Sequence, residues 1–301
     1  MRIYLSSIAP QIITDLNFIR PDLRLNVLQP FVFRNNQGID ADIWRSLKQI
    51  TNSLFLDSGT FELSRQCGLY DVEECFNKYA LSLDSLSSIF DLYANFDPDY
   101  KSNERLIVNL SFQDRLEEMG FMPIPVLHSR DEEEITYYLN SKYELVAISA
   151  QVISKLSSKS INLIVDRFNA VGKRVHLLGI GSFAKLKDSN AWSCDCSSFI
   201  RWAASGRAIF LSEVQQKEMK LSFSSHDKNG NPNSDYFNNT ANKAVRDEYE
   251  NFINYELDLD LNDVAADTSK LVMLNAFYLK WLEDVITQRQ KTGQFNSICG
   301  K

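Results

Sequence analysis

Short apolar segments that alternate with longer amphipathic segments most constrain the fold of this chain. The expected strands are Ile3–Ser7, Val27–Phe33, Ser53–Asp57, Leu92–Phe96, Met122–His128, Leu145–Ile148, Val175–Gly179, Ala191–Asp195 and Ala208–Leu211. Most are apolar at consecutive positions, as is typical of parallel strands buried on both faces. The segments Val72–Leu83, Asn103–Met119, Asp131–Asn140 and Ser160–Val171 have helical spacing instead. This α/β alternation, with roughly eight repeats, predicts a TIM-type (β/α)8 barrel rather than an open sheet.

The barrel is expected to occupy residues 1–222 and to carry a C-terminal helical extension. One expected strand is surplus, so either Val27–Phe33 or Ala208–Leu211 lies outside the ring. Residues 223–240 are rich in Ser, Asn, Asp and Gly and predict a flexible loop. Residues 241–301 then predict helices at Ala241–Asn254 and Thr268–Gln288 that pack on the barrel. The apolar stripe of the second helix favours packing against the barrel, with a homodimer surface as the alternative.

Charge and hydropathy indicate where in the cell the protein is expected and which partners it can bind. No apolar run approaches the ~20 residues that span a bilayer, so no membrane partner is expected. The N-terminal MRIYLSS resembles a first strand rather than a signal peptide, which predicts a cytoplasmic protein. The net charge of −7 argues against a strongly basic nucleic-acid-binding surface but leaves room for a local basic patch.

The cysteines predict free thiols and no metal. Cys67, Cys75, Cys194, Cys196 and Cys299 form an odd set without a disulfide framework. A zinc site needs four ligands at workable spacing, and Cys194-x-Cys196 has few partners when the chain holds only three histidines. We therefore expect no cofactor and no structural zinc.

Aspartates follow three of the expected strands. Asp57, Asp97 and Asp195 each come directly after an apolar run. Functional residues of such barrels lie at the C-terminal ends of strands. Capping of the following helix would explain any one of these aspartates. Three at one rim, beside glycine-containing turns at Gly59 and Gly179, favour a shared active site.

Three segments resemble motifs of the tRNA-guanine transglycosylase superfamily. Leu56-Asp57-Ser58-Gly59-Thr60-Phe61 resembles its Asp-Ser-Gly-Gly-aromatic signature. His176-Leu177-Leu178-Gly179-Ile180-Gly181 resembles its Gly-x-Gly strand, and Asp195-Cys196-Ser197-Ser198-Phe199 resembles its nucleophile segment. The Pro123–His128 strand and the compact length are similar to the phage and bacterial 7-deazaguanine DNA transglycosylases.

The resemblance implies an enzyme, a pentosyltransferase that exchanges guanine in DNA for a 7-deazaguanine such as preQ0 or a relative. It implies Asp195 as the nucleophile that forms a covalent sugar intermediate and Asp57 as the acid/base. The expected base-binding residues are Ser58, Phe61, Asp97, His128, Ser149, Leu178 and Gly179, with Phe61 and Leu178 sandwiching the ring. Arg130, Arg201 and Arg207 are candidates for phosphate contact. The setting it implies is the cytoplasm of a bacterial or phage-infected cell.

Departures from the family leave alternatives open. The tRNA enzymes carry three cysteines and a histidine as zinc ligands after the nucleophile, whereas only His226 and Cys299 follow Cys196 here. Ser149-Ala150 stands where the family usually has Gly-Gly, so the identity of the base stays open. DNA is preferred over tRNA as the partner nucleic acid. A zinc-less RNA-modifying enzyme, a non-catalytic scaffold subunit and an unrelated two-carboxylate hydrolase are the alternatives.

Overall fold

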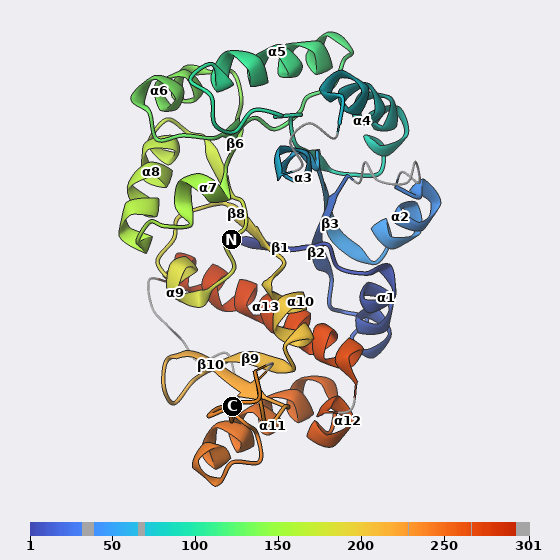
Figure 1. The fold of residues 1–301 in the computed structure, drawn as a ribbon, viewed down its shortest axis with the longest axis vertical. Coiled ribbons are helices and arrows are strands. Elements are labelled where there is room, and N and C mark those ends of the chain that lie inside the picture. Colours follow the sequence, from blue (N-terminus) through green and yellow to red (C-terminus); the bar gives the residue numbers. More distant parts are fainter. Residues whose placement is uncertain (32–38, 66–69, 228, 266, 293–301) are drawn as a thin grey trace.

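An eight-stranded parallel sheet forms the centre of the structure, a computed structural model that describes residues 1–31, 39–65, 70–227, 229–265 and 267–292. The strand order is β4-β3-β2-β1-β8-β7-β6-β5. The strands are β1 (Arg2–Ser6), β2 (Leu25–Pro30), β3 (Thr51–Asp57), β4 (Leu92–Tyr93), β5 (Val126–Leu127), β6 (Leu145–Ile148), β7 (Arg174–Leu177) and β8 (Ser193–Cys196). Helices alternate with these strands and surround the curled sheet (Figure 1). This α/β architecture is TIM-like.

The sheet does not close as a complete ladder between its two edge strands, β4 and β5. Both are shorter than the sequence predicts. Pro123 and Pro125 lack the N–H that could pair with β6, because the backbone groups of Ile124 between them face β4. A single parallel bridge remains at Ile124, between these prolines. Its N–H donates to the Tyr93 carbonyl at 2.8 Å, and its carbonyl accepts from the Asn95 N–H at 2.9 Å.

Some of the helices begin at a residue whose side chain caps them. Between consecutive strands lie α1 (Pro10–Ile19), α2 (Ala41–Lys48), α3 (Thr60–Arg65) with α4 (Val72–Leu86), α5 (Arg105–Glu118), α6 (Glu132–Asn140), α7 (Ala150–Ile153) with α8 (Ser158–Ala170), and α9 (Phe183–Leu186). The side chains of Asp40, Asp71 and Ser157 accept backbone N–H bonds at the starts of α2, α4 and α8. The four predicted helices among these are therefore present, with ends shifted by up to three residues.

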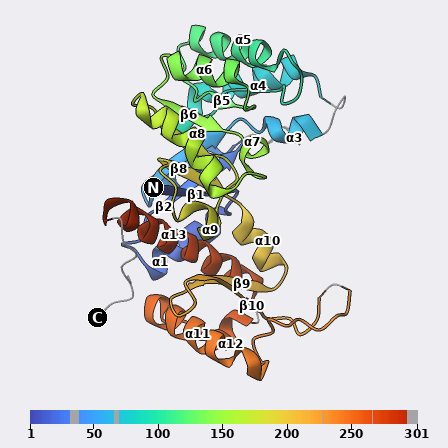
Figure 2. The same ribbon diagram turned by 90° about the vertical axis from the view of Figure 1, so that its left-hand side faces the viewer.

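A separate C-terminal unit follows α10 (Ser198–Ala204). It consists of the antiparallel hairpin β9 (Arg207–Ser212) and β10 (Lys217–Ser222), then η2 (Thr240–Asn242), α11 (Lys243–Leu257), α12 (Leu261–Ala265) and α13 (Thr268–Thr292). Ala208–Leu211 is thus the surplus strand outside the ring. The boundary expected at residue 222 groups this hairpin with the barrel, whereas it packs against α10, α11 and α13. In Figure 2 the hairpin, α11 and α12 lie at the opposite end of the molecule from α4, α5 and α6.

Helix α13 returns from this unit to the sheet and packs against β1 and α10 (Figure 1). Its apolar stripe, which includes Leu274, Tyr278 and Leu282, is buried within the chain. Helix α13 thus packs against the sheet as expected, whereas α11 contacts the hairpin β9–β10. None of the helices in the described ranges is long and apolar enough to cross a bilayer.

Glu283 of α13 provides a buried polar anchor for β1 and β2. Its Oε2 accepts from the Ile3 N–H and from Asn26 Nδ2, both at 2.6 Å, and its Oε1 accepts from Lys280 Nζ at 2.5 Å. The bonds satisfy an otherwise costly buried carboxylate. They fix α13 on the sheet at the end where β1 begins.

Glu283→Ala should lower the free energy of unfolding by ~2–4 kcal/mol, because it leaves buried donors without an acceptor. Denaturant unfolding measures this loss. Asp284→Ala is the matched control, since Asp284 is 59% exposed and its 3.2 Å pair with Lys280 lies in solvent. Asp284→Ala should lower the free energy of unfolding by less than ~1 kcal/mol. Equal losses for both variants would contradict the anchoring role.

Buried side chains form two layers. Tyr4, Leu28, Phe55, Ala94, Ile124, Val126, Leu145 and Ala147 form a cluster inside the curled sheet. A larger cluster lies between the sheet and its helices and includes Cys194 and Cys196. Side chains alternate along a strand, so these cysteines flank Asp195 but project to the opposite face. Both cysteines therefore lie away from the Asp195 side of the sheet.

Candidate active site

A cavity of about 240 Å³ lies at the carboxyl ends of the parallel strands. All predicted catalytic and base-binding residues line it: Asp57, Ser58, Phe61, Asp97, His128, Ser149, Leu178, Gly179 and Asp195. They come from six different strand ends, because parallel strands deliver the residues that follow them to one rim. The three aspartates singled out in the sequence therefore face one cavity.

Asp195 is held by two groups from β7 and its following turn. The Gly179 N–H donates to Asp195 Oδ1 at 2.9 Å, and His176 Nε2 lies 3.3 Å from the same oxygen. Asp195 is buried, with 7% of its surface exposed to solvent. Both contacts use Oδ1, which orients the carboxylate from one edge.

His176 is a positioning residue that sequence reasoning left out of the site. It is fully buried, and its Nδ1 lies 2.7 Å from Ser193 Oγ. The rings of Tyr4 and Phe55 pack edge-on against the His176 ring, with centroid distances of 5.8 and 5.1 Å. His176 lies two residues before the rim residue Leu178, and residues two apart on a strand point to the same face. This spacing could have identified His176 as a residue of the inner face of the sheet.

Asp57 ends β3 and carries a shifted proton affinity. Burial, opposed by hydrogen bonding from the Gly59 N–H and reinforced by the carboxylates of Asp195 and Asp97, raises the pKa of Asp57 to about 6. The Gly59 N–H donates to its Oδ2 at 3.1 Å, from a residue whose φ of 73° suits glycine. Such a carboxyl can hold or release a proton near neutral pH.

Asp97 forms a buried pair with His128. Asp97 Oδ2 lies 3.1 Å from His128 Nε2, and Asn95 Nδ2 donates to Asp97 Oδ1 at 2.5 Å. Burial raises the pKa of Asp97, and the hydrogen bond to His128 opposes this rise. His128 Nδ1 is buried without a hydrogen-bond partner among the described residues. A ligand could therefore supply the missing partner of this nitrogen.

An aromatic rim borders the cavity beside Asp97. The Tyr100 ring packs edge-on against the rings of His128 and Phe61, with centroid distances of 4.6 and 6.3 Å. The hydroxyls of Tyr100 and Thr60 lie 2.7 Å apart. Phe61 is 48% exposed, which leaves much of its ring available to a ligand. Tyr100, Thr60 and Gln151 line the cavity although the sequence analysis did not select them.

Two glycines shape the turn after β7 for different reasons. Gly179 has a φ of 70° and presents its N–H to Asp195. A Cβ on Gly181 would lie 2.2 Å from Cys196 Sγ, so the turn packs directly on the strand that carries Asp195. The close packing ties the Gly-x-Gly turn to the position of Asp195.

The three arginine candidates lie outside the cavity lining. Arg130 and Arg201 are exposed. Arg207 lies in the hairpin β9–β10, and its Nε is 3.2 Å from Asp235 Oδ2. Arg207 is thus engaged in an ion pair of the C-terminal unit rather than placed at the cavity.

The cysteines in the described ranges, Cys75, Cys194 and Cys196, are buried free thiols, while Cys67 and Cys299 lie outside those ranges. Burial raises the pKa of Cys196 to about 11, which disfavours the thiolate that binds metals. Within the part of the chain that the structure describes, no group of three or more His, Cys, Asp or Glu side chains is arranged to hold a metal ion.

Comparison with known proteins adds no relative to this geometry. No family model, no curated protein and no solved structure matches the chain.

Proposed function

We propose that the chain is a guanine transglycosylase built on a (β/α)8-type barrel. In this proposal it exchanges guanine in DNA for a 7-deazaguanine derivative through a covalent sugar intermediate on Asp195. The observation that carries the proposal is the convergence of Asp57, Asp97 and Asp195 on one small cavity. Those carboxylates meet aromatic and apolar side chains there, and the lining contains no Lys or Arg among the described residues. Such a lining suits a flat base rich in N–H donors better than a phosphate.

In the first step, a carboxylate oxygen of Asp195 attacks C1′ of the nucleotide. The C1′–N9 bond breaks, and its electron pair leaves with guanine. Oδ1 is already held by Gly179 and lies near His176, so Oδ2 is the oxygen assigned to the attack. Asp57 in its protonated form delivers the proton that makes the departing guanine neutral.

In the second step, the incoming base gives its N9 proton to Asp57 and attacks C1′. The C1′–O bond to Asp195 breaks, which restores the carboxylate. Asp57 is thereby reprotonated for the next turnover, so protons balance over the cycle. A pKa of about 6 supports this role because both forms are accessible near neutral pH.

Base recognition is assigned to the remaining lining groups. Asp97 accepts hydrogen bonds from N–H groups of the pyrimidine ring. His128 Nδ1, which has no partner among the described residues, supplies a further hydrogen bond. Ser149 follows β6 and lines the same cavity. Phe61 and Leu178 would sandwich the ring, a contact worth ~1–3 kcal/mol per stacked base.

DNA is proposed over tRNA because the zinc ligands typical of the tRNA enzymes have no matching cluster after Cys196. A base paired in a duplex must leave the stack to reach such a cavity. The exposed Arg130 and Arg201 are the remaining candidates for contact with the phosphates. Arg207 is the weaker candidate, because it forms an ion pair with Asp235.

Exchange of labelled guanine tests this function. The protein is incubated with radiolabelled guanine and, in parallel, duplex DNA, single-stranded DNA or tRNA. We expect label in DNA, lost when unlabelled guanine is added in excess. Label in tRNA alone would instead support the RNA-modifying alternative. Without transfer to any polymer, the enzymatic proposal fails and the scaffold alternative gains support.

A further inference from the structure

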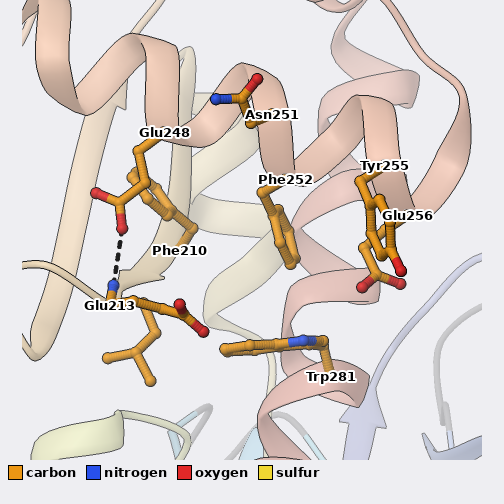
Figure 3. A pocket seen from close by; sticks show the side chains of 9 residues that line it. Phe210, Glu213, Glu248, Asn251, Phe252, Tyr255, Glu256 and Trp281 are labelled. Atoms are coloured by element: carbon orange, nitrogen blue, oxygen red, sulfur yellow. Dashed lines mark hydrogen bonds between the residues drawn. The ribbon is translucent and has the colours of Figure 1, made fainter. Parts of the chain in front are cut away.

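A second cavity, of about 300 Å³, lies in the C-terminal unit between β9, α11 and α13. It shares no lining residue with the candidate active site among the residues described. Figure 3 shows its wall of aromatic and acidic side chains, among them Phe252, Trp281 and Glu213. The proposed base exchange makes no use of this cavity.

Aromatic rings form one part of the wall. Phe252 packs edge-on to Trp281, with ring centroids 5.5 Å apart and planes at 79°. Tyr255 stands at the opening and is 74% exposed, unusual for a large aromatic side chain. Aromatic faces attract cations that come within ~6 Å of the ring centroid.

The same wall carries negative charge. Glu213, Glu248 and Glu256 line the cavity, while the described lining contains no Lys or Arg. Glu248 accepts from two neutral donors, Ser212 Oγ and the Glu213 N–H, each at 2.7 Å. Arg20 lies 3.3 Å from Glu256 and offsets part of the charge. The cavity therefore has an excess of negative charge beside aromatic surface.

The wall also holds a buried donor without a hydrogen-bond partner. Trp281 is 7% exposed, and its Nε1 has no hydrogen-bond partner among the described residues. In Figure 3 this nitrogen lies on the part of the indole ring toward Tyr255 and Glu256. A buried donor without an acceptor is unfavourable, and an acceptor on a bound molecule would remove this penalty.

We propose that this cavity binds a small organic cation that also carries a hydroxyl or carbonyl acceptor, with choline as the representative amino alcohol. The ammonium group lies against the aromatic rings and within the field of Glu213 and Glu248. The acceptor takes the hydrogen bond of Trp281 Nε1. Cation–π attraction and the carboxylates contribute the charge selectivity, and the indole N–H contributes the preference for an acceptor.

Three probes separate these contributions in calorimetric titration of the full chain. Choline carries both features, tetramethylammonium lacks the acceptor, and 3,3-dimethylbutan-1-ol is the neutral isostere of choline. We expect choline to bind at least ~10-fold more tightly than the neutral isostere, and tetramethylammonium to bind with intermediate affinity. Equal binding of choline and its isostere, or no binding of choline, would overturn the proposal.

Variants locate the site. Glu213→Gln should weaken choline binding ~3–10-fold with little change in shape. Trp281→Phe keeps an aromatic ring and removes the N–H, so it should weaken choline binding more than it weakens tetramethylammonium binding. Glu250→Gln is the matched control, because Glu250 lies on α11 outside the cavity lining.

Thermal melting establishes that each variant is folded before titration. If Trp281→Phe does not fold, the Glu213→Gln result decides. The proposal is wrong if choline affinity is unchanged in Glu213→Gln or falls equally in Glu250→Gln. Guanine exchange plays no part in this assay, so the two proposals fail independently.

Discussion

Asp195→Asn should abolish guanine exchange, with a loss of ~10⁴-fold or more, as expected when a covalent nucleophile is removed. The substitution keeps an oxygen that accepts from the Gly179 N–H, so the turn and the cavity should be preserved. Nucleic-acid binding should therefore stay within about threefold of the parent. Denaturing electrophoresis of protein incubated with labelled DNA measures the covalent complex, which should disappear.

Asp99→Asn is the control for this loss. Asp99 lies near the same rim but outside the cavity lining, and its carboxylate accepts from the Lys101 and Ser102 N–H groups. We expect its exchange activity within a few-fold of the parent. A covalent complex that persists in Asp195→Asn would show that Asp195 is not the nucleophile and would favour a merely structural role.

Asp57→Asn should slow exchange by ~10²–10⁴-fold, the typical contribution of a general acid/base. With the pKa of Asp57 at about 6, the guanine-expelling step should slow as pH rises above that value, because it needs the protonated carboxyl. The single-turnover rate plotted against pH should show this decline in the parent and lack it in Asp57→Asn. An unchanged pH profile in the variant would contradict the assignment.

The same substitution should stabilise the free protein at pH 8. The raised pKa means that the folded state binds the Asp57 proton more tightly than the unfolded state does. This contribution to stability is complete below the unfolded pKa of about 4 and is lost as pH rises through the folded pKa of about 6. Removing the charge should therefore raise the melting temperature by ~2–4 °C at pH 8 and have little effect at pH 4. A lower melting temperature at pH 8 would contradict the unfavourable burial of the Asp57 charge.

Local patterns were enough to predict most elements of the sheet and the position of its functional edge. Consecutive apolar residues marked the strands, and the residue after each strand could be assigned to the rim because parallel strands share a direction. Asp57, Asp97 and Asp195 were selected in this way, and all three line the cavity. The lengths of β4 and β5 were overestimated, and for β5 the missing N–H groups of Pro123 and Pro125 were not taken into account.

The sequence by itself determined the α/β alternation, the buried stripe of α13 and the identity of the rim carboxylates, because each depends on residues close along the chain. Tertiary structure alone decided which distant groups modify them. The pairing of Asp97 with His128, the approach of His176 to Asp195 and the raised pKa of Asp57 all depend on contacts between different strands. Likewise, the second cavity exists only because α13 returns to bring Trp281 beside Phe252. Hydrophobic periodicity reports which face of an element is buried, but distances between elements are decided when the sheet curls and the helices pack on it.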